Sequence, residues 1–210
     1  MSALPIDSRP ASRDLRPPTV FPLWLRVTHW LNAFGVILMV MSGWRVYNAS
    51  PLFGFVFPDP LTIGGWLGGA LQWHFAAMWI IVVNGLLYLI ANLVTKRLFT
   101  QFFPLSPRAA WADLKAALRG RLSHGDLRIY NTVQRAAYLF VMLDLVVLVL
   151  SGLVLWKSVQ FPLLRELLGG YETARRIHFF AMTGIVAFFA IHIVMTVLVP
   201  RTLLAMIRGR

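Results

Sequence analysis

The chain contains no cysteine and little negative charge, and both absences exclude classes of protein. Without cysteine there can be no disulfide, no thiolate zinc site, no iron–sulfur cluster and no haem attached through a CxxCH motif. Any haem must therefore be held non-covalently, by histidine or methionine. Only 8 residues are Asp or Glu, against 20 Lys and Arg among 210. This scarcity disfavours a metal carrier, which would normally place several acidic ligands near the middle of a membrane.

Apolar residues dominate what is present. Hydrophobic residues make up 58% of the chain and charged residues 13%, a composition that indicates an integral membrane protein. Four stretches are long enough to cross a hydrocarbon core, which takes about 20 helical residues. We therefore predict an all-α integral membrane fold, a four-transmembrane-helix bundle with spans over 24–47, 70–95, 131–156 and 173–199. The predicted organisation is a polar tail over 1–22, a transmembrane domain over 23–200 with a loop over 96–130, and a basic tail over 201–210.

The positive charges predict the orientation of the bundle. Four spans place both termini and the 96–130 loop on one side of the membrane, and that side carries fifteen of the Lys and Arg residues, against five on the other. Because basic residues are enriched on the cytoplasmic side, we expect cytoplasmic termini in a multi-pass protein of a bacterial inner membrane. The basic residues that flank the spans account for the net charge of +12, so no nucleic-acid partner is expected. The expected partner of these residues is membrane lipid.

The loops carry signals of their own. Ser106-Pro107 followed by an Ala/Leu-rich basic run to Arg119 and Gly120 predicts a short cytoplasmic helix. The 48–69 segment on the outer side is too apolar for a free loop, so it is expected to enter the interface or to contact a partner. A short amphipathic turn is predicted at Pro162–Leu168.

Four histidines lie at the ends of the spans, and their depths sort them into two pairs. His178 and His192 share one span with a spacing of fourteen residues, which on a helix returns to within about 40° of the same direction after a rise of about 21 Å. His29 opens the first span at the cytoplasmic side and His74 opens the second at the outer side. Depth alone therefore pairs His29 with His192 as an inner pair and His74 with His178 as an outer pair. Two imidazoles per site suit a six-coordinate haem that transfers electrons, which predicts two non-covalent haem b groups between the helices.

Other residues near these pairs have alternative roles. Arg26, Arg175 and Arg176 flank the ligands and are candidates for haem propionate contacts, although arginines also anchor span ends at the interface. Asp144 is the one acidic residue in mid-span. It either pairs with a polar group inside the bundle or takes part in proton movement.

Several motifs resemble a known family. The Arg26-Val27-Thr28-His29-Trp30 opening, Gln72-Trp73-His74, the entry Tyr130-Asn131-Thr132-Val133-Gln134-Arg135 and the His178/His192 pair are similar to bacterial four-helix di-haem cytochrome b subunits. That family serves nickel-iron hydrogenases, formate dehydrogenases and thiosulfate-reductase-like molybdoenzymes. Within it, the chain resembles most the short thiosulfate reductase cytochrome b type.

The resemblance implies a function and a quinone site. It implies an electron-transfer subunit between a periplasmic molybdopterin oxidoreductase and the quinone pool, with ubiquinone or menaquinone as substrate. It also implies a quinone near the inner pair, beside Asn131 and Gln134, whose amides could instead cap the third helix. Two other functions stay open: a stand-alone superoxide:quinone oxidoreductase, and a non-redox membrane anchor or metal carrier.

Overall fold

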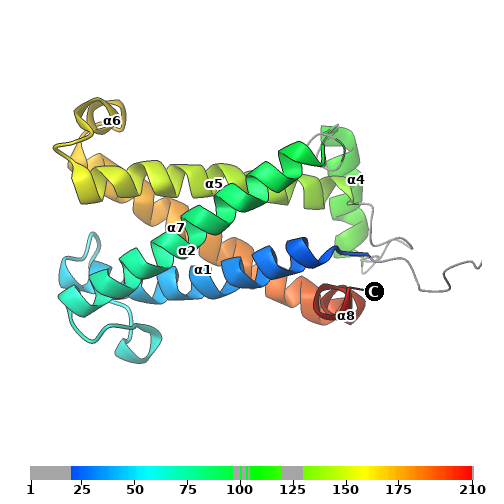
Figure 1. Ribbon diagram of the computed structural model, residues 1–210, viewed down its shortest axis with the longest axis horizontal. Helices are drawn as coiled ribbons and strands as arrows, with labels where there is room; N and C mark the ends of the chain where they lie inside the picture. The colour runs from blue at the N-terminus through cyan, green and yellow to red at the C-terminus, as the bar shows by residue number, and fades with distance from the viewer. Residues whose placement is uncertain (1–19, 97–99, 101–102, 104, 120–129, 210) are drawn as a thin grey trace, which may run out of the picture.

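Four long helices form the body of the computed structural model, which describes residues 20–96, 100, 103, 105–119 and 130–209 (Figure 1). The helices are α1 (Leu23–Ala49), α2 (Leu67–Val94), α5 (Thr132–Lys157) and α7 (Tyr171–Leu198). Each is long and apolar enough to cross a membrane, and each begins and ends within three residues of its predicted span. The prediction of an all-α four-helix membrane bundle is confirmed. The predicted tail over 1–22 and part of the 96–130 loop lie largely outside the described residues.

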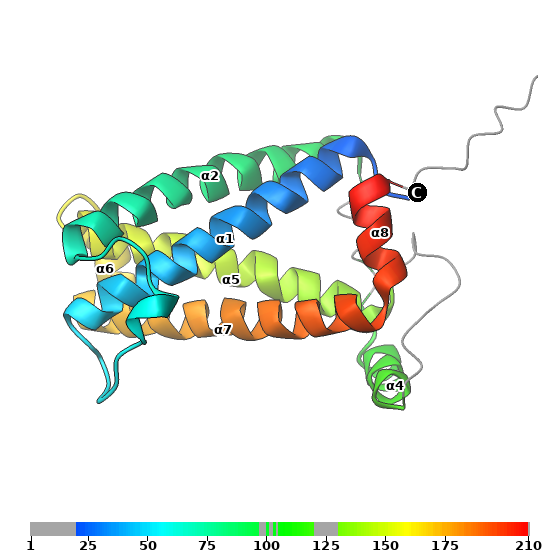
Figure 2. The same cartoon turned by 90° about the horizontal axis from the view of Figure 1, so that it is seen from below.

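The four helices are arranged as two antiparallel hairpins. α1 packs along α2 and α5 packs along α7, whereas helices of different hairpins come close at far fewer points. Figure 2 shows the α1–α2 hairpin above the α5–α7 hairpin. In the first hairpin the buried Asn84 of α2 donates hydrogen bonds to the Thr28 carbonyl oxygen at 2.7 Å and to Asn32 Oδ1 at 2.8 Å. These bonds hold α2 against α1 one residue from His29.

One end of the bundle is covered by connecting segments, and we call it the α6 end. The 50–66 connection contains η1 (Asp59–Leu61), and α6 (Pro162–Leu167) lies between α5 and α7, as the predicted amphipathic turn required. Arg45 forms an ion pair with Asp59 and also donates to the Gly65 carbonyl. Gly64 turns into α2 at φ 101°, where a Cβ atom would lie 2.3 Å from the Ala70 backbone nitrogen, so only glycine fits this turn.

The opposite end, the α8 end, carries two further helices (Figure 1). α4 (Pro107–Leu118) confirms the predicted short helix, and Ser106 Oγ accepts a hydrogen bond from the Ala109 N–H at 3.4 Å, as an N-cap should. Asp113 Oδ2 in turn accepts from the Thr132 N–H at 2.7 Å, which fastens α4 to the start of α5.

α8 (Pro200–Arg208) was not predicted, because its residues lie within the segment that the composition assigns to a basic tail. Its Ala205 is buried against Phe21 and Leu25, beside the start of α1. Gly209 ends the helix in the left-handed region at φ 83°, and its carbonyl oxygen accepts a hydrogen bond from the Val20 N–H at 2.9 Å. The two ends of the described chain are therefore joined at this side of the bundle.

Candidate haem sites

The structure brings the four histidines together in the same pairs that their depths predict. His29 of α1 faces His192 of α7 with ring centres 6.0 Å apart, and His74 of α2 faces His178 of α7 with ring centres 6.5 Å apart. We keep the names inner pair and outer pair for these two sets. Each pair joins one hairpin to the other, so the histidines meet across the space between the hairpins. Among the described residues there is no cluster of three or more His, Asp or Glu side chains suited to a bare metal ion.

The spacing within each pair matches an iron held by two imidazoles. A metal–nitrogen bond to histidine is about 2 Å and the bonded nitrogen lies about 1 Å from its ring centre, so two imidazoles on opposite sides of one metal have ring centres about 6 Å apart. The separations of 6.0 and 6.5 Å agree with this value. Directly packed rings lie about 4.5–7 Å apart, and both pairs have the edge-to-face orientation of such packing. The separations thus fit a metal between the rings and also fit direct ring packing.

The outer pair lies against one serine and one glycine from each hairpin. Ser42 Oγ is 3.0 Å from His74 Nδ1, and Ser151 Oγ is 3.0 Å from His178 Nδ1. Both serines are fully buried. A Cβ atom on Gly43 would lie 3.4 Å from His74 Cε1, and one on Gly152 would lie 3.3 Å from His178 Cε1. The two glycines thus let the rings approach the backbone of the neighbouring helix closely.

Aromatic side chains cluster at the α6 end, beside the helix turn that carries His178. Phe179, next to His178, has its ring centre 5.2 Å from both Tyr47 of α1 and Phe53 of the 50–66 connection. Phe55 and Phe57 also contact Tyr47, with ring centres 5.4 and 5.3 Å away. This aromatic cover, made of Tyr47, Phe53, Phe55, Phe57 and Phe179, links the two hairpins at the α6 end, next to His178 in the chain, and explains why the 48–69 segment is so apolar.

The inner pair has different neighbours. The Phe188 ring is stacked on His192 at 5.8 Å, and Trp30 meets His29 edge-on at 5.4 Å. Neither histidine ring has a hydrogen-bond partner in the part of the chain that the structure describes. The inner pair is therefore positioned by aromatic packing rather than by hydrogen bonds.

Comparison with known proteins identifies the family. The model of the prokaryotic cytochrome b561 family matches residues 20–209, which includes all four spans and all four histidines. The chain belongs to this family. A relative from Azospira oryzae, named "Putative protein-methionine-sulfoxide reductase subunit YedZ1", is 65% identical over 190 residues, which cover 90% of this chain and 96% of the relative. No solved structure matches the chain.

As a prokaryotic cytochrome b561, the chain is a multi-pass membrane protein that binds haem b. The histidine pairs provide two places with the donor set that this cofactor needs, and other features of the cytochrome fit a large group between the hairpins. Gly85 lies eleven residues after His74, within about 20° of the same helix face, and a Cβ atom there would meet nothing within 4 Å. The indole N–H of Trp44, next to Gly43, is buried with no hydrogen-bond partner among the described residues.

The remaining glycines near the spans have other neighbours. A Cβ atom on Gly35 would lie 2.8 Å from Ile81 Cδ1, so Gly35 serves the close packing of α1 on α2. Gly184 faces Asp144, whose Oδ2 would be 3.0 Å from the added Cβ. That oxygen is buried without a hydrogen-bond partner in the described part of the cytochrome, so the sequence-based pairing of Asp144 with a polar group is not seen there.

The three arginines that are candidates for haem propionate contacts differ in the hydrogen bonds that they already make. Arg26 donates to the Met206 carbonyl at 3.3 Å and the Ile207 carbonyl at 2.6 Å, so it caps the C-terminal end of α8. Arg175 donates to the backbone and side-chain oxygens of Ser50 and lies 3.6 Å from Glu172. Arg176 is exposed and has no hydrogen bond or ion pair with the described residues. Of the three, Arg176 is the one whose guanidinium is fully available.

Asn131 and Gln134 form a capping box at the start of α5. Asn131 Oδ1 accepts from the Gln134 N–H at 2.8 Å, and Gln134 Oε1 accepts from the Asn131 N–H at 3.0 Å. The capping role that was weighed against quinone binding is therefore present. Among the described residues only the amide oxygens are used, so both amide NH₂ groups remain as donors to a quinone carbonyl.

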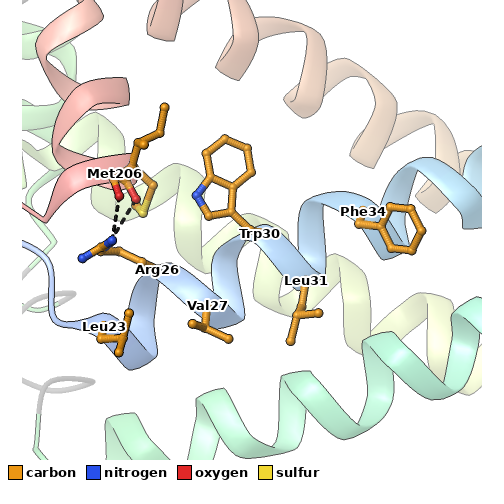
Figure 3. Close-up of a pocket in the computed structure, with 8 residues that line it drawn as sticks. Leu23, Arg26, Val27, Trp30, Leu31, Phe34 and Met206 are labelled. Carbon is orange, nitrogen blue, oxygen red and sulfur yellow. Dashed lines mark hydrogen bonds between the residues drawn. The ribbon is translucent and has the colours of Figure 1, made fainter.

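An apolar groove opens at the α8 end beside the inner pair (Figure 3). It has a volume of about 580 Å³ and lies between the first three turns of α1 and the last turn of α8. Leu23, Val27, Leu31 and Phe34 project from α1, and Trp30, the neighbour of His29, lies near Met206 of α8. Sequence reasoning missed this groove because it depends on α8.

Proposed function

We propose that this cytochrome transfers electrons across a bacterial inner membrane, between a periplasmic oxidoreductase and quinone, through two haem b groups. One observation carries the proposal: two histidine pairs, each with ring centres about 6 Å apart, lie one above the other between two helix hairpins. His29 with His192 and His74 with His178 are the proposed axial ligands. A bis-histidine haem supplies one-electron transfer without an open position for substrate.

The orientation follows from the distribution of charge. Both ends of the described chain lie at the α8 end, and the sequence assigned to that side holds fifteen of the twenty Lys and Arg residues, which supports a cytoplasmic location for that end. The inner pair then lies towards the cytoplasm and the outer pair towards the periplasm. Fourteen residues of α7 separate His178 from His192, a rise of about 21 Å, so the two sites together extend over most of a hydrocarbon core of about 30 Å.

The quinone site is proposed at the α8 end. The apolar groove beside Trp30 and His29 opens from the lipid-facing side of α1 and offers a route for an apolar quinone to approach the inner pair. Asn131 and Gln134 do not line this groove, and their amide NH₂ groups, unused among the described residues, are the proposed donors to a quinone that has moved on to the start of α5. Arg176, Arg175 and Arg26 are retained as candidate propionate contacts, with Arg176 first because the guanidinium groups of the other two already bind described residues.

The partner is proposed from the relative. Because the Azospira oryzae protein is named as a subunit of a protein-methionine-sulfoxide reductase, we propose a periplasmic reductase of oxidised methionine as the partner, of the molybdopterin type that the family resemblance implies. This replaces the thiosulfate reductase type as the preferred partner. A reductase partner also sets the direction of electron flow, from quinol through the cytochrome to the sulfoxide.

Haem content tests the proposal first. Purified protein should contain two haems b per chain by pyridine haemochrome, both reducible by dithionite with a b-type spectrum. One haem would remove the two-site path, and none would favour the non-redox anchor or metal carrier.

Electron delivery tests the quinone link and the partner. In membranes, a quinol analogue should reduce both haems, and methionine sulfoxide should reoxidise them only when the partner is present. The alternative, a superoxide:quinone oxidoreductase, would be supported by two results together. Superoxide would rapidly reduce the isolated cytochrome, and methionine sulfoxide would have no effect on the haems even when the partner is present.

A further inference from the structure

In both hairpins a Ser-Gly dipeptide contacts the histidine of the outer pair. Ser42-Gly43 lies near the end of α1 and contacts His74 of the following helix α2. Ser151-Gly152 lies near the end of α5 and contacts His178 of the following helix α7. The sequence shows the repeated Ser-Gly step, but close helix packing would explain such a step equally well. The structure places both serines on histidine nitrogens.

The direction of these hydrogen bonds follows from the other bonds that the serines make. Ser42 Oγ is 2.6 Å from the Leu38 carbonyl oxygen, and Ser151 Oγ is 2.6 Å from the Val147 carbonyl oxygen. A carbonyl oxygen can only accept, so each hydroxyl uses its single proton there. The hydroxyl oxygen must then accept from the imidazole, which makes Nδ1–H the donor at 3.0 Å in both histidines.

This arrangement selects one tautomer for each ring. With the proton on Nδ1, Nε2 of His74 and of His178 carries the free lone pair that a metal requires. An acceptor on Nδ1–H also raises the basicity of a ligating imidazole and thereby stabilises the oxidised metal. Both serines are fully buried, and the Met39 and Leu148 carbonyl oxygens are the other hydrogen-bond partners of the two rings.

We propose that Ser42 and Ser151 are positioning residues of the outer haem: they hold both axial imidazoles in the metal-binding tautomer and lower the reduction potential of that haem. The proposal rests on the proposed ligation of haem by the outer pair. It does not extend to the inner pair, whose rings have no hydrogen-bond partner among the described residues.

The test compares Ser42→Ala, Ser151→Ala and the double variant with wild type, in the purified full-length cytochrome. The measurements are haem content, potentiometric titration of each haem, and low-temperature electron paramagnetic resonance of the oxidised low-spin haems. Each single variant should raise the midpoint potential of the outer haem and move its resonance, with about twice the shift in the double variant. The inner haem should change in neither measurement.

Thr183→Ala is the matched control. The Thr183 hydroxyl donates to the Phe179 carbonyl at 2.9 Å, the same bond to the preceding helical turn that the serines make, but it has no hydrogen bond to a histidine of the described residues. This variant should leave both potentials unchanged. Loss of a helical hydroxyl alone therefore cannot account for a shift in the serine variants.

A second substitution decides the result if alanine removes the outer haem. Ser42→Thr and Ser151→Thr keep the hydroxyl, so they should retain two haems with the wild-type resonance. Failure of the threonine variants to restore the haem would overturn the role of the hydroxyl. Unchanged potentials and resonances in all alanine variants would also overturn it. The haem content of the wild-type protein would still test the proposed function separately.

Discussion

The two histidine pairs share α7 but take their other histidine from different helices, and they are stabilised in different ways. Each outer ring has a buried serine on Nδ1 and a glycine against Cε1, and the aromatic cover lies at the same end of the bundle. The inner rings rely on Trp30 and Phe188 and lie beside an open apolar groove. The histidine rings are held most firmly at the α6 end, whereas the α8 end has the groove through which a ligand can enter. This difference suits an outer site that exchanges electrons with a docked protein and an inner site that exchanges them with a diffusing quinone.

The two hairpins resemble each other at the outer pair but not at the inner pair. Ser42-Gly43 with His74 in the first hairpin corresponds to Ser151-Gly152 with His178 in the second, so the outer pair has approximate two-fold symmetry. The correspondence fails at the inner level.

Sequence spacing shows where the correspondence fails. His192 lies fourteen residues after His178, but the residue fourteen after His74 is Tyr88. Likewise, His29 precedes Ser42 by thirteen residues, while Tyr138 precedes Ser151 by thirteen. Each hairpin thus contributes one inner ligand, and a tyrosine takes the equivalent place in the other hairpin.

The largest expected effect is the loss of one haem from one site. His178→Ala should lower the haem content from two per chain to one and leave the inner haem, and His192→Ala should leave the outer haem. The reason is that each substitution removes one of only two ligands in a pair. Haemochrome quantitation and separate redox titrations would identify the haem that remains. Retention of both haems in His192→Ala would break the pairing on which the comparison depends.

Gly85→Phe is expected to have nearly as large an effect, confined to the inner site. Gly85 lies on the His74 face of α2, about 16 Å further along the axis, and a Cβ atom there meets nothing within 4 Å. If that space holds the inner haem, a phenyl ring should expel it and leave about one haem per chain. The control is Leu86→Phe, because Leu86 is 58% exposed on the lipid side. Two haems in the Gly85 variant would show that the space faces lipid.

Parts of this architecture follow from the sequence because they depend on local or periodic signals. The four spans depend on runs of apolar residues, α4 depends on Ser106-Pro107, and the histidine pairs depend on depth and on the spacing within α7. Asn131 was a recognisable N-cap for the same reason.

Other parts could not be predicted, because they depend on contacts between distant segments. α8 packs on Phe21 and Leu25, about 180 residues earlier in the chain, and without that contact Pro200–Arg208 looks like a basic tail. The serine–histidine bonds require the register of two helices to within one residue, which depth does not provide. Arg26 was expected at a propionate because it precedes His29 by three residues, but its hydrogen bonds go to α8.

Phe179→Ala should have an intermediate effect, because it opens the aromatic cover without removing a ligand. Each aromatic pair contributes about 1 kcal/mol, so the cover should loosen while both haems stay bound. We expect a several-fold faster reduction of the outer haem by a small hydrophilic reductant added from the periplasmic side of oriented vesicles. Phe180→Ala is the control, since Phe180 is 60% exposed and belongs to the edge of the cluster. Equal rates in the two variants would show that the cover does not limit access.

The smallest effect is expected from Arg26→Ala, and it separates a structural role from a cofactor role at the inner end. The guanidinium binds the last carbonyls of α8, and hydrogen bonds from a charged donor contribute about 1.5–3 kcal/mol, less where water reaches them. The variant should make α8 more sensitive to protease while the spectrum and potential of both haems stay as in wild type. Arg26→Lys keeps the charge but cannot reach both carbonyls with one planar group, so it should restore α8 only in part. If the alanine variant instead shifts the potential of the inner haem and the lysine variant restores it, Arg26 contacts a propionate. The inner haem would then be held by a polar side chain, as the serines hold the outer histidines, although the inner histidine rings have no such hydrogen bond.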